Sequence, residues 1–257
     1  MKYWQEILAI AQRILVELIR RGRSLILWGI FPILVLLLNG YIMAEKGKIE
    51  LAEAMALATP PTLVGAALFF SCLGGTVATV VAEREQQTIK RLFLSPLSGV
   101  SYFIGIFLAH CAIAACQTVL VYSIAKQYGA TFKGSIPLEL LIIFLSITAY
   151  VGLGFILGTQ LAKRTEDVNA LVGTFGVPLL ILGGVFLPTA LFPDNILSLA
   201  KYNPIYHMNE ALIAVWAKGE NLQDINSHFR FLCLFALAMV AGGWLTYRQM
   251  LNLERRL

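Results

Sequence analysis

Hydrophobic positions along the chain cluster into long runs that are separated by short polar segments. A helix needs about 20 apolar residues to cross a hydrocarbon core of roughly 30 Å, and the runs have about that length. The pattern therefore predicts an all-α integral membrane protein with six transmembrane helices, in a single membrane domain over residues 1–257. The predicted spans are residues 24–44, 58–82, 99–124, 138–162, 168–188 and 229–250.

The amino-acid composition supports a membrane location. Hydrophobic residues make up 58% of the 257 residues and charged residues only 14%, whereas about a quarter of the residues in a soluble domain are charged. So little charge cannot cover a surface that faces water. The four cysteines lie inside apolar runs without a C-x-x-C pair, and the three histidines are scattered, so we expect neither disulfides nor a metal site.

Residues 1–23 form a different kind of element. Apolar side chains from Trp4 to Leu18 recur at i, i+3, i+4 and i+7, and charged side chains occupy the other face. This spacing predicts an amphipathic helix that lies at the membrane interface. A secretory signal is the alternative, but the apolar run after Arg23 is too long and no A-x-A-like cleavage site follows it.

The basic residues predict the orientation. With the N-terminus in the cytosol, every arginine except Arg230 lies on the cytoplasmic side of the six spans. Cytoplasmic loops of membrane proteins carry an excess of basic residues. We therefore expect a multi-pass protein of the cell membrane (inner or plasma membrane) with both termini in the cytosol.

The most highly charged short stretch, EREQQTIKRLFLSP at residues 83–96, lies between the second and third spans. A charged residue at the centre of a span costs about 2.5–3.5 kcal/mol, against a few tenths gained per Leu or Ile. Placing Glu83, Arg84 and Glu85 in the hydrocarbon would therefore cancel most of the span's gain. The membrane is expected to end by Ala82.

The same stretch has the pattern of a short surface helix. Acidic residues stand near its N-terminus and basic residues toward its C-terminus, as the helix dipole favours, and Pro96 ends it. Ile89, Leu92 and Phe93 form one apolar patch at i, i+3 and i+4 among Glu83, Arg84, Glu85, Lys90 and Arg91. Such a helix suits docking into a groove of a cytosolic partner. The alternative is a solvated loop whose charges only set the topology.

Residues 189–228 are predicted to be external. Asp194 can cap a first short helix, and Asn203-Pro204 breaks it, because the residue before proline is pushed out of the helical conformation. Residues 205–216 then resume helical spacing. Two short, half-apolar helices around a break predict a re-entrant hairpin, which membranes tolerate where protein covers the backbone. Two helices lying on the outer surface are the alternative.

At this point the sequence resembles a known family. The pattern E-R-E-x-x-T-x-x-x-L-x-x-x-P resembles that of type-2 ATP-binding-cassette (ABC) exporter permeases, which also have an N-terminal interface helix, six spans and an N-P break before the last span. Gln87 departs from the family, which often has glycine there. The pattern is met by Glu83, Arg84, Glu85, Thr88, Leu92 and Pro96, and the break by Asn203-Pro204.

The resemblance implies a role for residues 83–96 as the coupling helix that fits a cleft in an ATPase subunit. It implies a permease subunit of an ATP-driven exporter, paired with a second permease chain as a homodimer and embedded in the bilayer. The chain has no G-x-x-x-x-G-K-[ST] phosphate loop, so we expect it to bind no cofactor, with ATP and Mg on the ATPase partner, and no nucleic acid. The residues assigned to ATPase coupling are Glu83, Arg84, Glu85, Thr88, Lys90, Arg91, Leu92, Phe93 and Pro96.

The spans contain few ionisable residues, namely His110 and, near a span entrance, Glu139. A pathway poor in charge favours a lipid-linked, amphipathic or drug-like substrate. Gly154, Gly158 and Ala162 form a small-x-x-x-small ridge that allows close helix approach, either within the chain or in a dimer. Polar residues that could line a path or hydrogen-bond between helices are Asn39, Gln117, Gln160 and Asn169.

Two other functions stay open at this stage. An intramembrane enzyme acting on lipid-linked substrates would need clustered acids, bases or metal ligands at the membrane surface. An ABC-linked membrane anchor would move no cargo. The candidates for the enzyme are Glu166-Asp167 and a group in the external hairpin, Asp194, His207 and Glu210. Asn203 and Pro204 of the same hairpin form its break.

Overall fold

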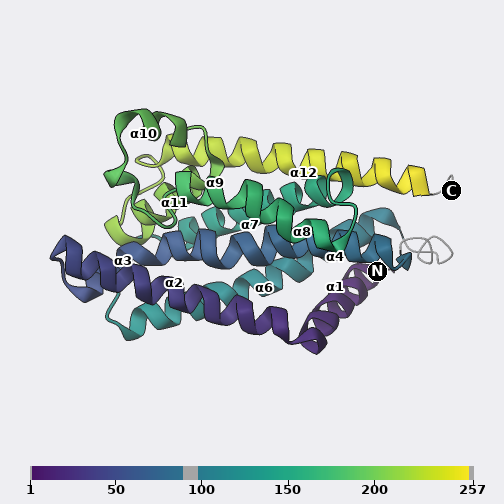
Figure 1. The fold of residues 1–257 in the computed structure, drawn as a ribbon, viewed down its shortest axis with the longest axis horizontal. Coiled ribbons are helices and arrows are strands. Elements are labelled where there is room, and N and C mark those ends of the chain that lie inside the picture. Colours follow the sequence, from purple (N-terminus) through teal and green to yellow (C-terminus); the bar gives the residue numbers. More distant parts are fainter. Residues whose placement is uncertain (1, 89–97, 255–257) are drawn as a thin grey trace.

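A computed structural model describes residues 2–88 and 98–254, and these residues form helices, turns and loops without a strand (Figure 1). Six helical segments are long and apolar enough to cross a membrane by length and composition. They confirm the predicted all-α membrane fold. The segments are Leu25–Gly47, Leu51–Glu85, Gly99–Gln127, Ile136–Gln160, Thr165–Leu182 and Asn226–Asn252.

The long helices run roughly along one direction (Figure 1). Both termini lie toward one end of the bundle, which we call the N/C end, and α10 (Asp194–Ala200) lies at the opposite end, which we call the hairpin end. The residues on either side of 89–97 are at the N/C end. The bundle therefore separates two polar regions, one at each end.

Helix α1 (Lys2–Arg21) has the predicted amphipathic character. Ile10 and Ile14 are buried, and α1 packs along α6 (Gly99–Gln127). Trp4, at the start of the predicted apolar face, remains 59% exposed, so only the middle of that face is covered by protein. Gly22, with φ +51°, turns the chain from α1 into α2 (Arg23–Gly47), a left-handed conformation that glycine adopts without strain.

The second span is the most buried and has three parts: α3 (Leu51–Pro61), η1 (Thr62–Gly74) and α4 (Gly75–Glu85). The helix begins at Leu51, before residue 58, because Glu53 sits in its first turn, where the helix dipole favours an acidic residue. Pro60 and Pro61 lack an N–H, and the backbone winds as a wider π-helix directly after them. The helix continues past Ala82 to Glu85.

Helix α7 (Ile136–Gln160) forms the most extensive pair with α12 (Asn226–Glu254). Glycines allow this approach: a Cβ atom on Gly152 would lie 2.5 Å from the carbonyl carbon of Met239, and one on Gly243 would lie 2.7 Å from the Gly152 oxygen. The sequence analysis did not identify this seam.

The predicted small-residue ridge is used inside the chain. A Cβ atom on Gly154 would lie 2.7 Å from Cβ of Thr76, and one on Gly158 would lie 3.1 Å from Cβ of Val80. The ridge thus lets α7 approach α4. Of the two uses left open, the structure supports internal packing.

Several polar side chains inside the bundle bond between helices. Gln117 donates to the Trp28 carbonyl at 2.9 Å and Asn39 to the Val185 carbonyl at 3.4 Å. His110 is fully buried with Nδ1 3.0 Å from the Ser71 carbonyl, and Glu139 accepts from Tyr122. Gln160 and Asn169 are exposed.

The fifth span is one continuous helix, Thr165–Leu182, made of α8 (Thr165–Leu171), the π-helical η2 (Val172–Gly176) and α9 (Val177–Leu182). It ends before the predicted residue 188, because Gly183 and Gly184 turn the chain. The hairpin end follows, with η3 (Thr189–Leu191), α10, α11 (Pro204–Ile213) and η4 (Ala214–Lys218). Met208 and Leu212 of α11 are fully buried, and α11 packs against α12, α7 and α3, whereas α10 is largely exposed. The two helices therefore differ: α11 is inserted between other helices, whereas α10 lies on the outside of the bundle.

Candidate functional site

The candidate site is the charged junction Glu83-Arg84-Glu85 at the end of α4. The structure describes this part of the predicted coupling helix, together with Thr88, which is half-buried. Residues 89–97 lie outside the described residues. The predicted roles of Lys90, Arg91, Leu92, Phe93 and Pro96 therefore stay predictions. The single helix predicted over residues 83–96 is wrong at its start: Glu83–Glu85 end α4, and Gln86 and Gln87 form a turn, because the positive φ of Gln87 (+53°) cannot continue a right-handed helix.

Glu83 connects α4 to α1. Its carboxylate forms an ion pair with the guanidinium of Arg13. The Glu83 side chain is 7% exposed and that of Arg13 is 40% exposed, so the carboxylate is enclosed while the guanidinium still reaches the surface. A buried carboxylate without its counter-ion is strongly unfavourable. The pair therefore fixes α1 against the end of α4.

Arg84 connects α4 to the end of α7. Its guanidinium donates to the carbonyl oxygens of Thr159, at 3.4 Å, and of Ala162. The last carbonyl groups of a helix have no partner within the helix and carry its negative dipole end. A cation placed there satisfies these groups and complements the dipole.

Glu85 connects α4 to the start of α8. Its carboxylate accepts hydrogen bonds from the Thr165 backbone N–H, at 3.1 Å, and from the Thr165 hydroxyl. Asp167 accepts a second pair of hydrogen bonds at this turn, from the backbone N–H groups of Lys163 at 3.0 Å and Arg164 at 2.9 Å. Carboxylates at a helix N-terminus satisfy free N–H groups.

Three consecutive residues thus contact three different elements. Successive side chains on a helix with 3.6 residues per turn point about 100° apart, so Glu83, Arg84 and Glu85 face α1, α7 and α8 in turn. The sequence predicts these charges on the faces of a docking helix. In the structure they have partners within the chain, and the junction joins α4 to three other elements.

Gln87, where the sequence departs from the glycine of the family pattern, lies in the turn after α4. Its backbone has φ +53°, and its N–H donates to the Arg84 carbonyl at 3.0 Å. Residues other than glycine adopt this left-handed region at a cost. The glycine that the family often has at this position would fit the turn without strain.

We therefore expect Gln87→Gly to stabilise the folded protein, by about 1 kcal/mol at most. Gln86, with φ −77°, is the matched control, because glycine there relieves no strain and only loosens the unfolded chain. The measurement is the thermal unfolding midpoint in detergent. Equal shifts for the two variants would contradict the expectation.

At the hairpin end, Asn203 fixes the break between α10 and α11. Its Oδ1 accepts from the Ile205 N–H at 3.0 Å, and its Nδ2 donates to the Leu179 carbonyl at 2.6 Å. Pro204 occupies the first turn of α11, where its missing N–H costs nothing. Asp194 does not cap α10 as predicted: Pro193 is the N-cap residue and no side chain caps the helix, because Asp194 is already its first residue and is exposed.

The histidine and glutamate of α11 have separate partners. His207 Nε2 donates to the Lys201 carbonyl at 2.9 Å, its Nδ1 lies 2.9 Å from Nδ1 of His228, and Thr189 donates to Glu210 at 2.5 Å. The described residues contain no group of three His, Cys, Asp or Glu side chains placed to hold a metal ion. The hairpin residues thus hold the α11 contacts in place.

The His207–His228 contact predicts a pH effect. Burial lowers the pKa of His207 below its ordinary value of 6.5, against smaller opposing effects of the Lys201 carbonyl and of Glu210. An unfolded chain then takes up a proton more readily than the folded one, so stability is present at neutral pH and falls as the pH drops below about 6.5. We expect the thermal midpoint to fall between about pH 7.5 and about pH 5.5.

His207→Phe is the control for this effect, because a phenyl ring can keep the stacking on Phe231, whose ring centre lies 3.9 Å from that of His207. The variant should lose much of the pH dependence. His228 and the charge of Glu210 remain in both proteins. An unchanged pH profile would contradict the assignment to His207.

The fold and the junction define a class of protein: a polytopic helical membrane protein with polar connections at one end and, at the other, a helical hairpin of which only α11 is inserted between other helices. Residues 50–245 match the family model described as ABC-2 family transporter protein, from just before α3 to within α12. The chain therefore belongs to the ABC-2 transporter family.

Curated relatives agree with this family. The chain is similar to the "Probable multidrug ABC transporter permease YbhR" of Escherichia coli K12, with 26% identity over 178 residues, which is 68% of this chain and 48% of the relative. It is also similar to the "Inner membrane transport permease YhhJ" of the same organism, with 23% identity over 176 residues, 68% of this chain and 47% of the relative. The chain spans about half the length of the curated relatives it matches.

Sequence reasoning missed the partners of the junction. The sequence places Arg13 on the polar face of the interface helix and Ala162 in the small-residue ridge, and it gives no role to Thr159 or Thr165. The charge pattern shows that Arg13 and Glu83 can attract each other. It does not show that α1 returns to the end of α4.

Proposed function

We propose that this chain is the permease subunit of an ATP-driven ABC exporter, coupled to a separate ATPase subunit that holds ATP and Mg. Membership of the ABC-2 family and the similarity to named transport permeases support this proposal. Two copies of the chain would form the pathway in a cell (inner or plasma) membrane, with both termini in the cytosol. The substrate would be lipid-linked, amphipathic or drug-like, which agrees with the name of the multidrug relative.

The observation that carries the proposal is the junction at the end of α4. The segment that follows Glu85 and Thr88 is the predicted docking site for the ATPase. Because Glu83, Arg84 and Glu85 bind α1, α7 and α8, a displacement of that segment would move all three elements together. Coupling needs two conformations of the membrane helices, and an ATPase partner whose ATP-bound and ATP-free forms bind these two conformations with different free energies.

The test is gentle purification of the tagged protein from its native membrane, followed by identification and ATPase assay of what accompanies it. An ATPase subunit in equal amount, lost with Leu92→Asp, is the expected result. Leu199→Asp is the matched control, because Leu199 is 62% exposed on α10 at the hairpin end. Recovery of the chain alone, without ATPase activity, would overturn the proposal.

A further inference from the structure

The second span winds unusually in its middle. Residues Thr62–Gly74 (η1) form a π-helix, in which an N–H group bonds to the carbonyl five residues earlier instead of four. The winding begins directly after Pro60 and Pro61, which have no N–H for such bonds, and at its end the N–H of Gly75 still bonds to the Phe70 carbonyl. Most π-helical segments are one turn long, and they are frequent at functional sites. A segment of 13 residues is far longer than usual.

Side chains of two neighbouring helices bind carbonyl groups of η1. Near its start, the Tyr150 hydroxyl of α7 donates to the Val64 carbonyl at 3.1 Å. Near its end, Nδ1 of His110 of α6 donates to the Ser71 carbonyl at 3.0 Å. Both donor side chains are buried. In a regular α-helix the N–H four residues later occupies such a carbonyl, so these two donors stabilise the π winding from outside the span.

The π winding leaves hydroxyl groups unsatisfied at both of its ends. Thr62, the first residue of η1, and Thr76, just after its end, have buried hydroxyls with no hydrogen-bond partner among the described residues. Other hydroxyls of the same span donate to the carbonyl four residues earlier, as is common in helices; they belong to Thr59, Ser71 and Thr79. A buried donor without a partner is unfavourable, so a winding that gives these two hydroxyls a carbonyl is close in free energy to the present one.

The fifth span has a π-helical segment of its own, η2, which contacts η1. The Phe69 ring of η1 fits against it because residue 176 is glycine: a Cβ atom on Gly176 would lie 2.3 Å from Cζ of Phe69. Between these segments and the junction, the second span continues as α4 and the fifth span contains α8. Glu85 ties the two together, because it accepts from the Thr165 N–H at 3.1 Å. Two neighbouring spans thus change their winding where they touch, and the helices next to the junction are joined.

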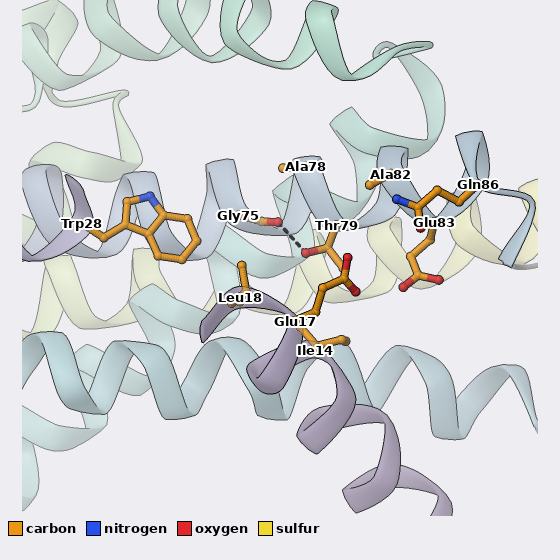
Figure 2. A pocket seen from close by; sticks show the side chains of 10 residues that line it. All are labelled: Ile14, Glu17, Leu18, Trp28, Gly75, Ala78, Thr79, Ala82, Glu83 and Gln86. Carbon is orange, nitrogen blue, oxygen red and sulfur yellow. Dashed lines mark hydrogen bonds between the residues drawn. The ribbon is translucent and has the colours of Figure 1, made fainter. Parts of the chain in front are cut away.

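Helix α4 has free space beside it. A cleft of about 90 Å³ lies between α1, α2 and α4, and its α4 wall runs from Gly75 to Gln86 (Figure 2). Trp28 closes the end at Gly75, where a Cβ atom would lie 3.1 Å from Cη2 of the indole. The Thr79 hydroxyl donates to the Gly75 carbonyl at 2.8 Å, four residues earlier, so α winding has resumed here (Figure 2). A regular helix with an open side can turn and shift as a unit.

From these observations we propose that η1 and η2 form a joint in the membrane, at which the second and fifth spans change their winding. In the described state both segments are π-wound, and Tyr150 and His110 stabilise this state. In a second state part of each segment is α-wound and therefore narrower and longer, so α4 and α8 move together toward the N/C end. The proposal deepens the proposed function and rests on it for the driving force, which is the pull of the ATPase on the segment after Thr88.

The test measures the distance across η1 between two spin labels in the full chain, purified with its ATPase partner. The labels are attached to p-acetylphenylalanine at the exposed positions of Glu53 in α3 and Gln86 after α4. The native cysteines, among them the buried Cys72 of η1, then stay unchanged. We expect one main distance without nucleotide. With ATP and vanadate we expect a distance longer by about 3 Å, because an α-helix rises about 1.5 Å per residue and the wider winding rises less.

Two variants weaken the π-wound state without changing the label positions. Tyr150→Phe keeps the ring and removes the hydroxyl donor, so it should raise the ratio of the longer to the shorter distance roughly fivefold, as for the loss of one hydrogen bond. His110→Phe removes the other donor and should act in the same direction. Tyr202→Phe is the matched control, because Tyr202 is 83% exposed at the hairpin end, and it should leave the distances unchanged.

A second pair of labels guards against a general rearrangement. Residues 140 and 160 are exposed and lie within α7, a single α-helix, so their distance should be the same in every variant and with every nucleotide. A change in this distance equal to that across η1 would overturn the joint. Label distances across η1 that are equal in wild type, Tyr150→Phe and His110→Phe, with and without ATP, would overturn it as well.

The comparison of wild type with Tyr150→Phe needs no ATPase. If the chain purifies without an ATPase and Tyr150→Phe still raises the proportion of the longer distance, the proposed export function fails and the joint stands. If the ATPase accompanies the chain and the distance across η1 never changes, the joint alone fails. The two proposals can therefore fail independently.

Discussion

Replacing Arg13 by methionine is expected to destabilise the protein by about 2–3 kcal/mol. Methionine keeps much of the side-chain volume but leaves the Glu83 carboxylate, 7% exposed, without its counter-ion. Loss of one partner of a fully buried pair costs about 3–5 kcal/mol, and the expected value is lower because Arg13 is itself 40% exposed. The measurement is equilibrium unfolding in detergent micelles.

A double-mutant cycle separates the pair from general damage to α1. Arg13→Met combined with Glu83→Gln removes both charges, so the double variant should be more stable than Arg13→Met alone. Arg20→Met, an exposed position on the same helix, should change stability by less than about 0.5 kcal/mol. A double variant whose loss equals the sum of the two single losses would show that the ion pair does not hold α1.

Gly152→Ala is expected to have the second large effect, a loss of about 2–3 kcal/mol or failure to fold. The added Cβ would lie 2.5 Å from the carbonyl carbon of Met239 and 2.8 Å from the Val240 nitrogen. Both are backbone atoms and cannot move aside as a side chain can. Helices α7 and α12 would have to separate, and their contact is the most extensive in the described bundle.

Gly29→Ala provides the opposite control. Gly29 lies in α2 with no atom within 4 Å of the position of an added Cβ, so alanine there meets no obstacle. Alanine is the better helix former by about 1 kcal/mol, so this variant should be neutral or slightly stabilising. The measurements are the size-exclusion profile and the thermal unfolding midpoint of each variant, compared with those of the wild type. Similar losses at both positions would contradict the proposed seam.

The two glycine contacts of α7, with α4 and with α12, show what the sequence alone cannot predict. The spacing of Gly154, Gly158 and Ala162 revealed a ridge but could not say which helix it meets, and the structure places it against α4. Gly152 and Gly243 each lie near other small residues of their own helix, Gly154 and Gly242, so the sequence does not show which of these glycines meets another helix. Their pairing is visible only when both helices are in place.

The helical hairpin at residues 189–228 also has one feature that the sequence predicts and one that only the structure shows. Asn203-Pro204 is a local break, because proline restricts the residue before it, and the helices on both sides of it are present. The different burial of the two helices was not predictable, since residues 194–200 and 204–213 have similar half-apolar patterns. Contacts of α11 with α3, α7 and α12 decide which of the two is inserted.

By itself, the sequence determined the helical membrane class, the six apolar segments, the amphipathic first helix, the charged stretch after the second span and the resemblance to ABC permeases. Each of these depends on neighbouring residues, through transfer free energy, helical periodicity or a short motif. Only the tertiary structure decided that Arg13 meets Glu83, that Arg84 meets the end of α7 and that Glu85 meets α8. These contacts join residues 70 to 80 positions apart in the chain. The sequence contains several other charged residues that could pair with Glu83, Arg84 or Glu85. The choice among them follows from how the helices pack.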